Sequence, residues 1–441
     1  MYASKHQQDH YADCADHPGT GSFHCGSCLR DIALVKALRK LGHEVLLVPM
    51  YLPLITEEPI AEREVFFGGV NVFMQQQSAV FRHTPRWLDR WLDQPGLLRS
   101  VARKAHLTSP QAQGELMLSM LAGEDGKQAK ELHRLVEFLR GQPKADAVVL
   151  SNAMLLGLAP GLQKGLGVKV LATLQGEDTF VDRLPEALRE QAWGKLRELA
   201  QQVDGRVAVS RYYRDTMAER LHLAPTAIDV VYNGIDLSAY ETAGPATPSA
   251  DQPVVGYLAR MCPDKGLHTL VDAFVVLMQR GQLPGARLHI AGARTPGDVA
   301  YVDEQQAKLT QAALRERVTF SPNVELAEKL AMLRSCSVLS VPATYGEAFG
   351  LYVLEALAMG VPVVEPRHGG LTELVEQTGG GMLCKPDDAV DLAQKLEELL
   401  LDSDHAHKLG ATGQAVVRER FTMETMAREV IKIYQRVVDG R

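Results

Sequence analysis

Apolar and polar positions follow two patterns along this chain, and together they predict helices and strands in turn. Residues 29–42 carry leucine, isoleucine and valine at helical spacing, and a short apolar, β-rich run follows at 43–51. Other runs have the composition of buried strands and lie near turns or near helical segments such as 186–203: 145–151, 168–175, 205–210 and 228–234. Strands that alternate with helices indicate a parallel, doubly wound sheet.

The same pattern restarts after a segment that has no period. Residues 233–253 are rich in Gly, Pro, Ser, Thr and Ala, a composition typical of a linker between domains. A helical segment lies at 266–281, and strand-like runs occupy 254–260, 286–292, 317–323, 336–343 and 360–366. The chain of 441 residues is therefore predicted to form two α/β domains. Ligands bind beyond the carboxyl ends of strands in such sheets, so we expect chemistry in the loops that follow strands.

Composition and charge narrow the function. The formal net charge of -7 and the pI near 6.1 disfavour a broad nucleic-acid interface, and we find no nucleic-acid motif, so no nucleic-acid partner is expected. The N-terminus lacks a basic segment followed by an apolar one, and no apolar run is long enough to span a membrane, which predicts a cytoplasmic protein. The six cysteines are then expected to be reduced thiols.

One stretch places two carboxylates around the start of an apolar helix. In GEAFGLYVLEALAMG, residues 346–360, Glu347 precedes the helix and Glu355 lies about 12 Å further along it. A helix N-terminus offers unpaired N–H groups to an anion, and Gly350 lets a ligand approach the backbone. Two carboxylates this far apart can accept hydrogen bonds from two ends of one elongated ligand. The alternative is two solvent-facing glutamates, but Glu355 has apolar neighbours, so we expect it to have a partner.

Two cations follow the first strand of the second domain. In GYLARMCPDKGLHTL, residues 256–270, Arg260 and Lys265 lie in the loop between a strand and a helix. Together they could neutralise a diphosphate at the helix N-terminus. The alternative is that they have no such role, because loops often carry arginine and lysine.

In combination these motifs resemble those of the retaining nucleotide-sugar glycosyltransferases of family 4. The resemblance rests on RMCPDKG at 260–266, the E-x7-E element within 342–364, and the runs GGLTELV and GMLCKPDD at 369–375 and 381–388. Segments at 207–215 and 230–236 are similar to those that close the family's N-terminal domain, and 421–438 resembles its last helix. The match covers most of the chain from about residue 20.

The resemblance implies the GT-B fold, in which two doubly wound Rossmann-like domains with parallel sheets face each other across a cleft. The acceptor domain would comprise residues 1–240 and the nucleotide-sugar donor domain residues 252–420. The C-terminal helix, 421–441, would cross back to the first domain.

The resemblance also implies roles for individual residues. Arg260 and Lys265 would hold the donor diphosphate and stabilise the charge of the leaving group, an electrostatic role. Glu355 would bind the ribose hydroxyls and Glu347 those of the donor sugar. The expected catalytic residues are Glu347, Arg260 and Lys265, and the donor-binding set adds Glu355, Phe349, Gly350, Leu351 and Gly21.

The activity implied is retaining hexosyl transfer from a UDP- or GDP-sugar to the hydroxyl of a glycan, lipid or small molecule. Family members need neither a cofactor nor a bound metal, and the D-x-D sequence at 402–404 follows a helical run and is expected to cap a helix instead. One alternative is a nucleotide-sugar epimerase on the same fold, which would need no acceptor. Another is a non-catalytic protein that binds a nucleotide-sugar.

The N-terminal domain departs from the family pattern at two places. The glycine loop at Gly19 and Gly21 follows a polar stretch, where the family has a short apolar strand. Many members have a histidine near the reacting centre, and this chain has Gln175, which cannot exchange a proton. Gln175 could bind a sugar hydroxyl, brace Asp178 or be a loop residue without a role.

Two more N-terminal features have alternative interpretations. Four residues of types that bind zinc lie close together: Cys14, His17, Cys25 and Cys28. Their short spacing, and the similarity of CGSCLRD to some family sequences, favour packing beside the glycine loop. Residues 82–106 interleave arginines with tryptophans, which suits peripheral contact with an anionic membrane or a helix with inward aromatics. Acidic residues within the segment favour the latter.

Overall fold

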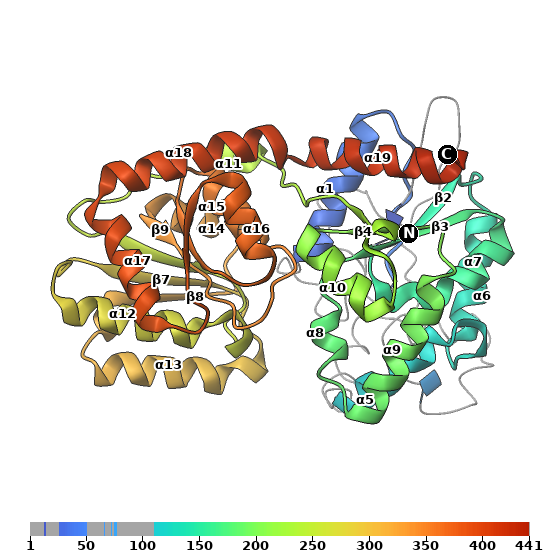
Figure 1. The fold of residues 1–441 in the computed structure, drawn as a ribbon, viewed down its shortest axis with the longest axis horizontal. Helices are drawn as coiled ribbons and strands as arrows, with labels where there is room; N and C mark the ends of the chain where they lie inside the picture. The colour runs from blue at the N-terminus through green and yellow to red at the C-terminus, as the bar shows by residue number, and fades with distance from the viewer. Residues whose placement is uncertain are drawn as a thin grey trace. The chain divides into compact units, whose positions relative to one another are not determined.

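The chain forms two compact units, each a parallel sheet with helices on both faces (Figure 1). The computed structural model describes residues 13–14, 26–50, 66, 72, 75–76 and 110–440. Unit 1 comprises Met1–Val231 and Met426–Arg441, and unit 2 comprises Tyr232–Thr425. The predicted class of two Rossmann-like α/β units is confirmed.

In the described part of unit 1, five parallel strands lie side by side in sequence order. They are β1 (Asp13–Cys14), β2 (Ala147–Leu150), β3 (Lys169–Leu174), β4 (Gly205–Ala208) and β5 (Asp229–Val230). The central strands β2 and β3 are buried almost throughout, as expected for strands with helices on both faces. The helices are α1 (Gly26–Lys40), α5 (Pro110–Leu121), α6 (Ala129–Arg140), α7 (Ala159–Leu166), α8 (Asp178–Val181), α9 (Glu186–Ala200) and α10 (Arg211–Leu221).

The start of unit 1 differs from the pattern-based prediction. The polar stretch with no strand signal contributes β1, which pairs in parallel with β2. Conversely, the apolar run predicted as a strand at 43–51 forms no regular strand over its described residues, where only Leu47 takes part in a bridge. Val45, Leu47 and Val48 are nevertheless buried. Apolar composition reports burial, whereas a strand also requires another backbone alongside it to pair with.

The last helix, α19 (Met423–Asp439), packs one apolar stripe inward. Met426, Val430 and Tyr434 are each about 2% exposed and recur at helical spacing. Near its C-terminal end, Arg436 pairs with Asp229 of β5. From Met426 onward, the helix therefore belongs to unit 1 although it follows unit 2 in sequence.

The sheet of unit 2 has six parallel strands in the order β11-β10-β9-β6-β7-β8. They are β6 (Val254–Leu258), β7 (Arg287–Gly292), β8 (Val318–Pro322), β9 (Val338–Leu339), β10 (Val363–Pro366) and β11 (Gly381–Cys384). Its helices are α11 (Ser238–Ala243), α12 (Leu267–Arg280), α13 (Val299–Gln311), α14 (Leu326–Ser335), α15 (Leu351–Ala358), α16 (Gly369–Thr378), α17 (Ala389–Leu401) and α18 (Ser403–Arg420).

Two local predictions in unit 2 have definite outcomes. The segment 233–253, which has a linker composition, contains the short helix α11, and Tyr240 of this helix is buried against the unit. The sequence shows no helical periodicity there because the helix is only six residues long. Asp402 caps α18 by accepting a hydrogen bond from the backbone N–H of His405 at 2.9 Å, so the predicted helix cap is confirmed.

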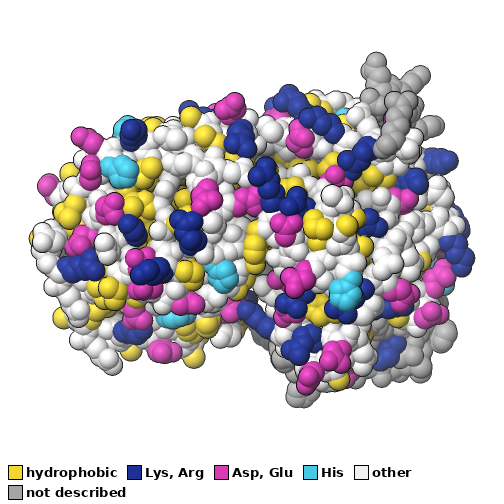
Figure 2. Space-filling model, in the orientation of Figure 1, with side chains coloured by type: hydrophobic (Ala, Val, Ile, Leu, Met, Phe, Trp, Pro, Cys, Tyr) yellow, Lys and Arg dark blue, Asp and Glu magenta, His cyan; other side chains and the backbone are white. Residues whose placement is uncertain are grey.

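Some predicted features lie outside the described residues. These are Gly21, residues 82–106, and the side chains of Cys14, His17, Cys25 and Cys28. Among the helices of the described ranges, none combines the length and apolar character needed to cross a membrane. On the face drawn in Figure 2, basic and acidic side chains are interspersed.

Candidate donor site

The order of strands in unit 2 creates a topological switch point between β6 and β9. The chain runs outward from β6 to β7 and β8, then returns to the other side of β6 at β9 and continues to β10 and β11. Loops that leave the carboxyl edge on opposite sides of a switch point leave a crevice in which ligands bind. Lys265 follows β6 and Glu347 follows β9, so two of the predicted residues lie at this point of the sheet.

A close backbone contact holds these two loops together. Gly266 begins α12 with φ of 66°, and a Cβ added there would lie 1.7 Å from the carbonyl oxygen of Pro342. Only glycine fits this combination of a left-handed backbone and close approach. One residue pair adds a hydrogen bond between the loops, from the Thr344 N–H to the Asp264 carbonyl at 2.9 Å. Lys265 is therefore fixed against the segment that leads into α15.

Lys265, Tyr345 and Glu347 form one hydrogen-bonded cluster. The Lys265 ammonium pairs with the Glu347 carboxylate and donates to the Tyr345 hydroxyl at 2.6 Å, while that hydroxyl lies 3.0 Å from the other Glu347 oxygen. Burial alone would lower the pKa of Lys265, but the charge of Glu347 and the contact with Tyr345 outweigh it and raise that pKa. Lys265 therefore carries its charge at neutral pH, and the cluster presents a cation, a carboxylate and a phenol together.

The start of α15 lies directly beyond this cluster. Gly350 is its N-cap with φ of 98°, and a Cβ added there would meet the side chain of Leu371 at 2.6 Å. Phe349 is buried and Leu351 is the first helical residue. The Gly370 N–H donates to the Glu347 carbonyl at 2.7 Å, which fixes the loop that carries the carboxylate. The N–H groups at the start of α15 are thus held close in sequence and space to Glu347.

Arg260 lies in a separate ion pair. Its guanidinium makes two hydrogen bonds to Asp298, of 3.0 and 2.9 Å, and a third of 3.3 Å to the Thr295 hydroxyl. Burial would raise the pKa of Asp298, but the hydrogen bonds from Arg260 and Thr295 outweigh it and lower that pKa. Asp298 thus orients the Arg260 guanidinium. The Arg260 side chain is 52% exposed, so it remains accessible to solvent.

Glu355 has the partner that its apolar surroundings predict. The Lys329 ammonium of α14 lies 2.8 Å from the carboxylate, and each side chain is 18% exposed. The structure thus gathers Lys265, Glu347 and the start of α15 around one point. Arg260 and Glu355 instead stand in ion pairs of their own.

Sequence reasoning missed several residues that contact the predicted ones. Tyr345 lies two residues before Glu347, and Asp298 stands three residues after Thr295 in a capping-box spacing that could have been recognised. Lys329 carried no signal, because α14 has no motif that singles it out. Only their contacts in the structure connect Tyr345, Asp298 and Lys329 with the predicted residues.

A further buried acid lies on the same sheet. Glu365 of β10 is fully buried, and both of its carboxyl oxygens lie 3.3 Å from the Val341 N–H. Burial raises its pKa well above the ordinary value, and the charge of Glu347 raises it further, although Val341 opposes the shift. Burial therefore favours the neutral, protonated form of Glu365.

In unit 1, Gln175 lies at the carboxyl end of β3. Its side-chain amide donates to the Ser151 carbonyl, and its backbone N–H donates to Glu177 at 2.8 Å. Asp178 accepts a hydrogen bond of 2.9 Å from Tyr213. The pKa of Asp178 is raised, mainly by burial. The side chain of Tyr213 therefore hydrogen-bonds Asp178, whereas that of Gln175 bonds the Ser151 carbonyl.

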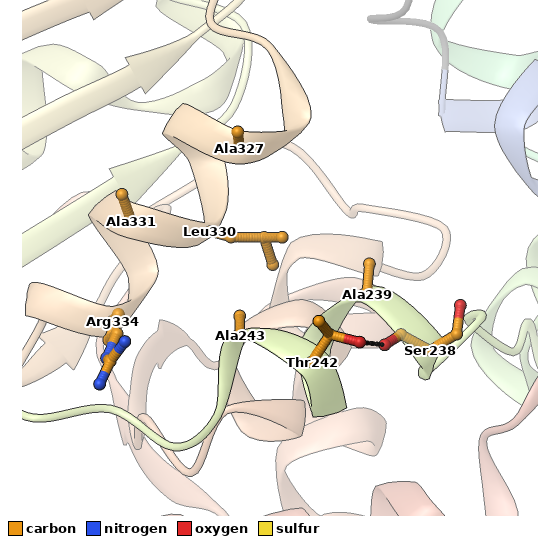
Figure 3. Close-up of a pocket in the computed structure, with 8 residues that line it drawn as sticks. All are labelled: Ser238, Ala239, Thr242, Ala243, Ala327, Leu330, Ala331 and Arg334. Carbon is orange, nitrogen blue, oxygen red and sulfur yellow. Dashed lines mark hydrogen bonds between the residues drawn. The ribbon is translucent and has the colours of Figure 1, made fainter.

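A cavity of about 550 Å³ lies between α11 and α14 (Figure 3). Figure 3 shows Ala327, Leu330 and Ala331 on one wall and Arg334 at one end. None of the residues predicted to bind the donor lines this cavity. The switch point of unit 2 is thus a better candidate site than the cavity, because the charged groups converge there.

Two Rossmann-like units, one with a charged site at its switch point, define a protein of the GT-B class. The sequence profile described as "Glycosyltransferase Family 4" matches residues 122–239, and the profile "Glycosyl transferases group 1" matches residues 243–416. The chain therefore belongs to glycosyltransferase family 4, which confirms the family that its motifs resemble.

Individual proteins agree with this assignment. The D-inositol 3-phosphate glycosyltransferase of Nocardia farcinica is 31% identical over 42% of this chain and 42% of its own length. A GDP-mannose-dependent phosphatidylinositol monomannoside mannosyltransferase of Corynebacterium glutamicum is 26% identical over 69% of this chain and 79% of its own. The chain thus spans less than half of the first relative.

Solved structures share the fold across nearly the whole chain. Anabaena HepE in complex with UDP and glucose superposes with a TM-score of 0.66 at 19% identity, over 96% of this chain and 99% of that one. Sucrose-phosphate synthase from Thermosynechococcus elongatus gives a TM-score of 0.70 at 19% identity, over 98% and 100%. At this identity the likeness shows the fold.

Proposed function

We propose that this chain transfers a sugar from a nucleotide-sugar to an acceptor hydroxyl, with retention of anomeric configuration and without a bound metal. The observation that carries the proposal is the cluster of Lys265, Tyr345 and Glu347 at the switch point, beside the N-terminus of α15. A cation and the N–H groups at a helix N-terminus suit a diphosphate, and a carboxylate suits sugar hydroxyls. Relatives named for GDP-mannose and inositol phosphate chemistry, and a fold neighbour with bound UDP, support a nucleotide-sugar donor.

In the proposed reaction, the bond between the anomeric carbon and the diphosphate breaks, and a bond from that carbon to the acceptor oxygen forms. Lys265 and Arg260 stabilise the negative charge that grows on the departing diphosphate. Two cations in these positions would stabilise the leaving group's charge, as a metal ion does in other transferases. Glu347 fixes the donor sugar through its hydroxyls. Because the acceptor attacks from the face that the diphosphate leaves, the departing phosphate oxygen is the nearest base for the acceptor proton.

Binding of the donor must reorganise the charges around Lys265. Glu347 neutralises Lys265 in the structure, so a diphosphate has to share or replace this partner. Sugar hydroxyls can then satisfy the released carboxylate. The exchange couples the two ends of the ligand, because Lys265 becomes available to phosphate when Glu347 turns to the sugar.

Calorimetric titration of UDP-glucose, GDP-mannose and ADP-glucose tests the proposal. We expect one donor to bind wild-type protein, and Lys265→Met to weaken it about 10- to 100-fold, the range for a charge-assisted hydrogen bond. Lys308→Met is the matched control, since Lys308 also forms an ion pair within unit 2, with Asp272, but lies on α13. Folded wild-type protein that binds none of the donors would refute the proposal.

Turnover separates the reaction from its alternatives. We expect the bound donor to release its nucleoside diphosphate to water slowly and faster when an acceptor hydroxyl is supplied. Nuclear magnetic resonance of the product then reports the anomeric configuration, and chelation should leave the rate unchanged. An inverted product would contradict retention, and conversion of the donor into an epimer without an acceptor would favour the epimerase.

A further inference from the structure

Glu355 occupies a position in which a charge needs support. It lies on α15, where Val353, Leu354, Ala356 and Leu357 are all buried. An ionised carboxylate in such surroundings is costly unless a cation or hydrogen-bond donors compensate for the lost water. The charge of Glu355 therefore needs a compensating group beside it.

Lys329 supplies that compensation from another helix. Its ammonium lies 2.8 Å from the Glu355 carboxylate and 3.3 Å from the hydroxyl of Tyr240, which belongs to α11. It also lies 5.7 Å from the centre of the Tyr240 ring, within the range of a cation–π contact. Three helices thus converge on one ammonium group and restrict where it can lie.

Tyr240 borders the ion pair of Lys329 and Glu355 without adding a charge to it. Burial first, and then the negative charge of Glu355, raise the pKa of Tyr240 well above its ordinary value. The phenol therefore keeps its proton in the physiological range and adds no charge. Within the cluster, Lys329 and Glu355 form the ion pair.

The place of Lys329 in the fold sets it on the ligand side of the sheet. In a parallel sheet, the helix that follows a strand begins at the carboxyl edge, where ligands bind. Lys329 is in the first turn of α14, which follows β8, and Glu355 is in the second turn of α15, which follows β9. A pair needed only for packing could lie at either end of these helices.

We propose that Lys329 is a positioning residue for donor binding: it fixes the Glu355 carboxylate so that this group can accept hydrogen bonds from the ribose hydroxyls of a nucleoside diphosphate. The inference rests on the proposed function. A carboxylate has about four lone-pair positions, so it can bind Lys329 and two hydroxyls together. Lys329 itself need not touch the ligand.

The test compares nucleotides with and without these hydroxyls. Affinities of UDP, GDP and ADP, and of their 2′,3′-dideoxy forms, are measured by calorimetry for wild type, Lys329→Met, Lys329→Arg and Glu355→Gln. We expect wild type to prefer its ribonucleotide about 10- to 100-fold over the dideoxy form. Glu355→Gln and Lys329→Met should lose most of this preference, and Lys329→Arg should keep much of it.

Controls separate positioning from general damage. Lys395→Met removes a lysine that pairs with Glu398 at 3.2 Å on α17, and should leave the preference unchanged. Thermal unfolding checks that each variant is folded, and Lys329→Gln provides a second uncharged variant should the methionine variant fail to fold.

The outcomes distinguish this inference from the proposed function. If wild type shows the preference and the uncharged variants keep it, or if they weaken both nucleotides equally, Lys329 is not a positioning residue and the proposed function stands. If wild type binds a nucleotide without preference, the role of Glu355 fails and the inference fails with it. If wild type binds no nucleotide at all, both proposals are overturned.

Discussion

The ion pair between Lys265 and Glu347 makes a quantitative prediction about stability. Their side chains are 22% and 14% exposed, so the pair is well shielded from water. Removing one partner of a buried pair costs roughly 3–5 kcal/mol, because the other charge is left unpaired. Tyr345 remains in contact with whichever partner is left, so we expect a smaller loss of about 2–3 kcal/mol for Lys265→Met or Glu347→Gln.

A double-mutant cycle isolates the interaction. Urea-induced unfolding of wild type, both single variants and the double variant gives the free energies, and we expect a coupling energy of about 1–3 kcal/mol. The pair of Lys308 with Asp272 is the control, because these side chains are 36% and 43% exposed and exposed pairs couple by about 1 kcal/mol or less. Additive losses within about 0.5 kcal/mol would refute the geometry of the cluster.

The pH dependence of this coupling provides a second check. The folded-state pKa of Lys265 is raised. A group of this kind contributes stability that is fully present below its unfolded pKa of about 10.4 and is lost only as pH rises through the higher folded pKa. We therefore expect the same coupling at about pH 7 and about pH 9, and a marked decline between them would contradict the assignment.

Two further predictions concern the buried acid and the loop contact. Because burial raises the folded pKa of Glu365, its contribution to stability is fully present below its unfolded pKa of about 4.3 and is lost as pH rises through the higher folded pKa. Glu365→Gln should therefore flatten the fall in unfolding free energy as pH rises above the unfolded pKa, and an unchanged fall would count against this role. Gly266→Ala should destabilise the protein far more than Gly281→Ala in thermal unfolding. The two glycines flank α12 with φ of 66° and 71°, but only the first has the Pro342 carbonyl in the way, so equal losses would disprove the close contact.

Much of the site could be predicted because its residues stand in short motifs after strands. Lys265 and Glu347 were predicted as one ligand-binding group, and the structure places them in contact across the two loops. The partner of Glu355 was predicted from its apolar neighbours without being identified. Lys329 lies 26 residues before Glu355, and no local pattern links the two helices. Their contact exists because α14 and α15 both start at the carboxyl edge of the sheet.

The sequence by itself determined the class of fold and the chemistry of the loops, since hydrophobic periodicity and local motifs depend on residues close together in the chain. It could not determine which backbones form strands, as the polar strand β1 and the apolar run around Leu47, which forms no regular strand, demonstrate. Nor could it determine which charges neutralise one another. The strand order in unit 2 decides this for Lys265 and Glu347, because the switch point brings their loops, about 80 residues apart, into contact.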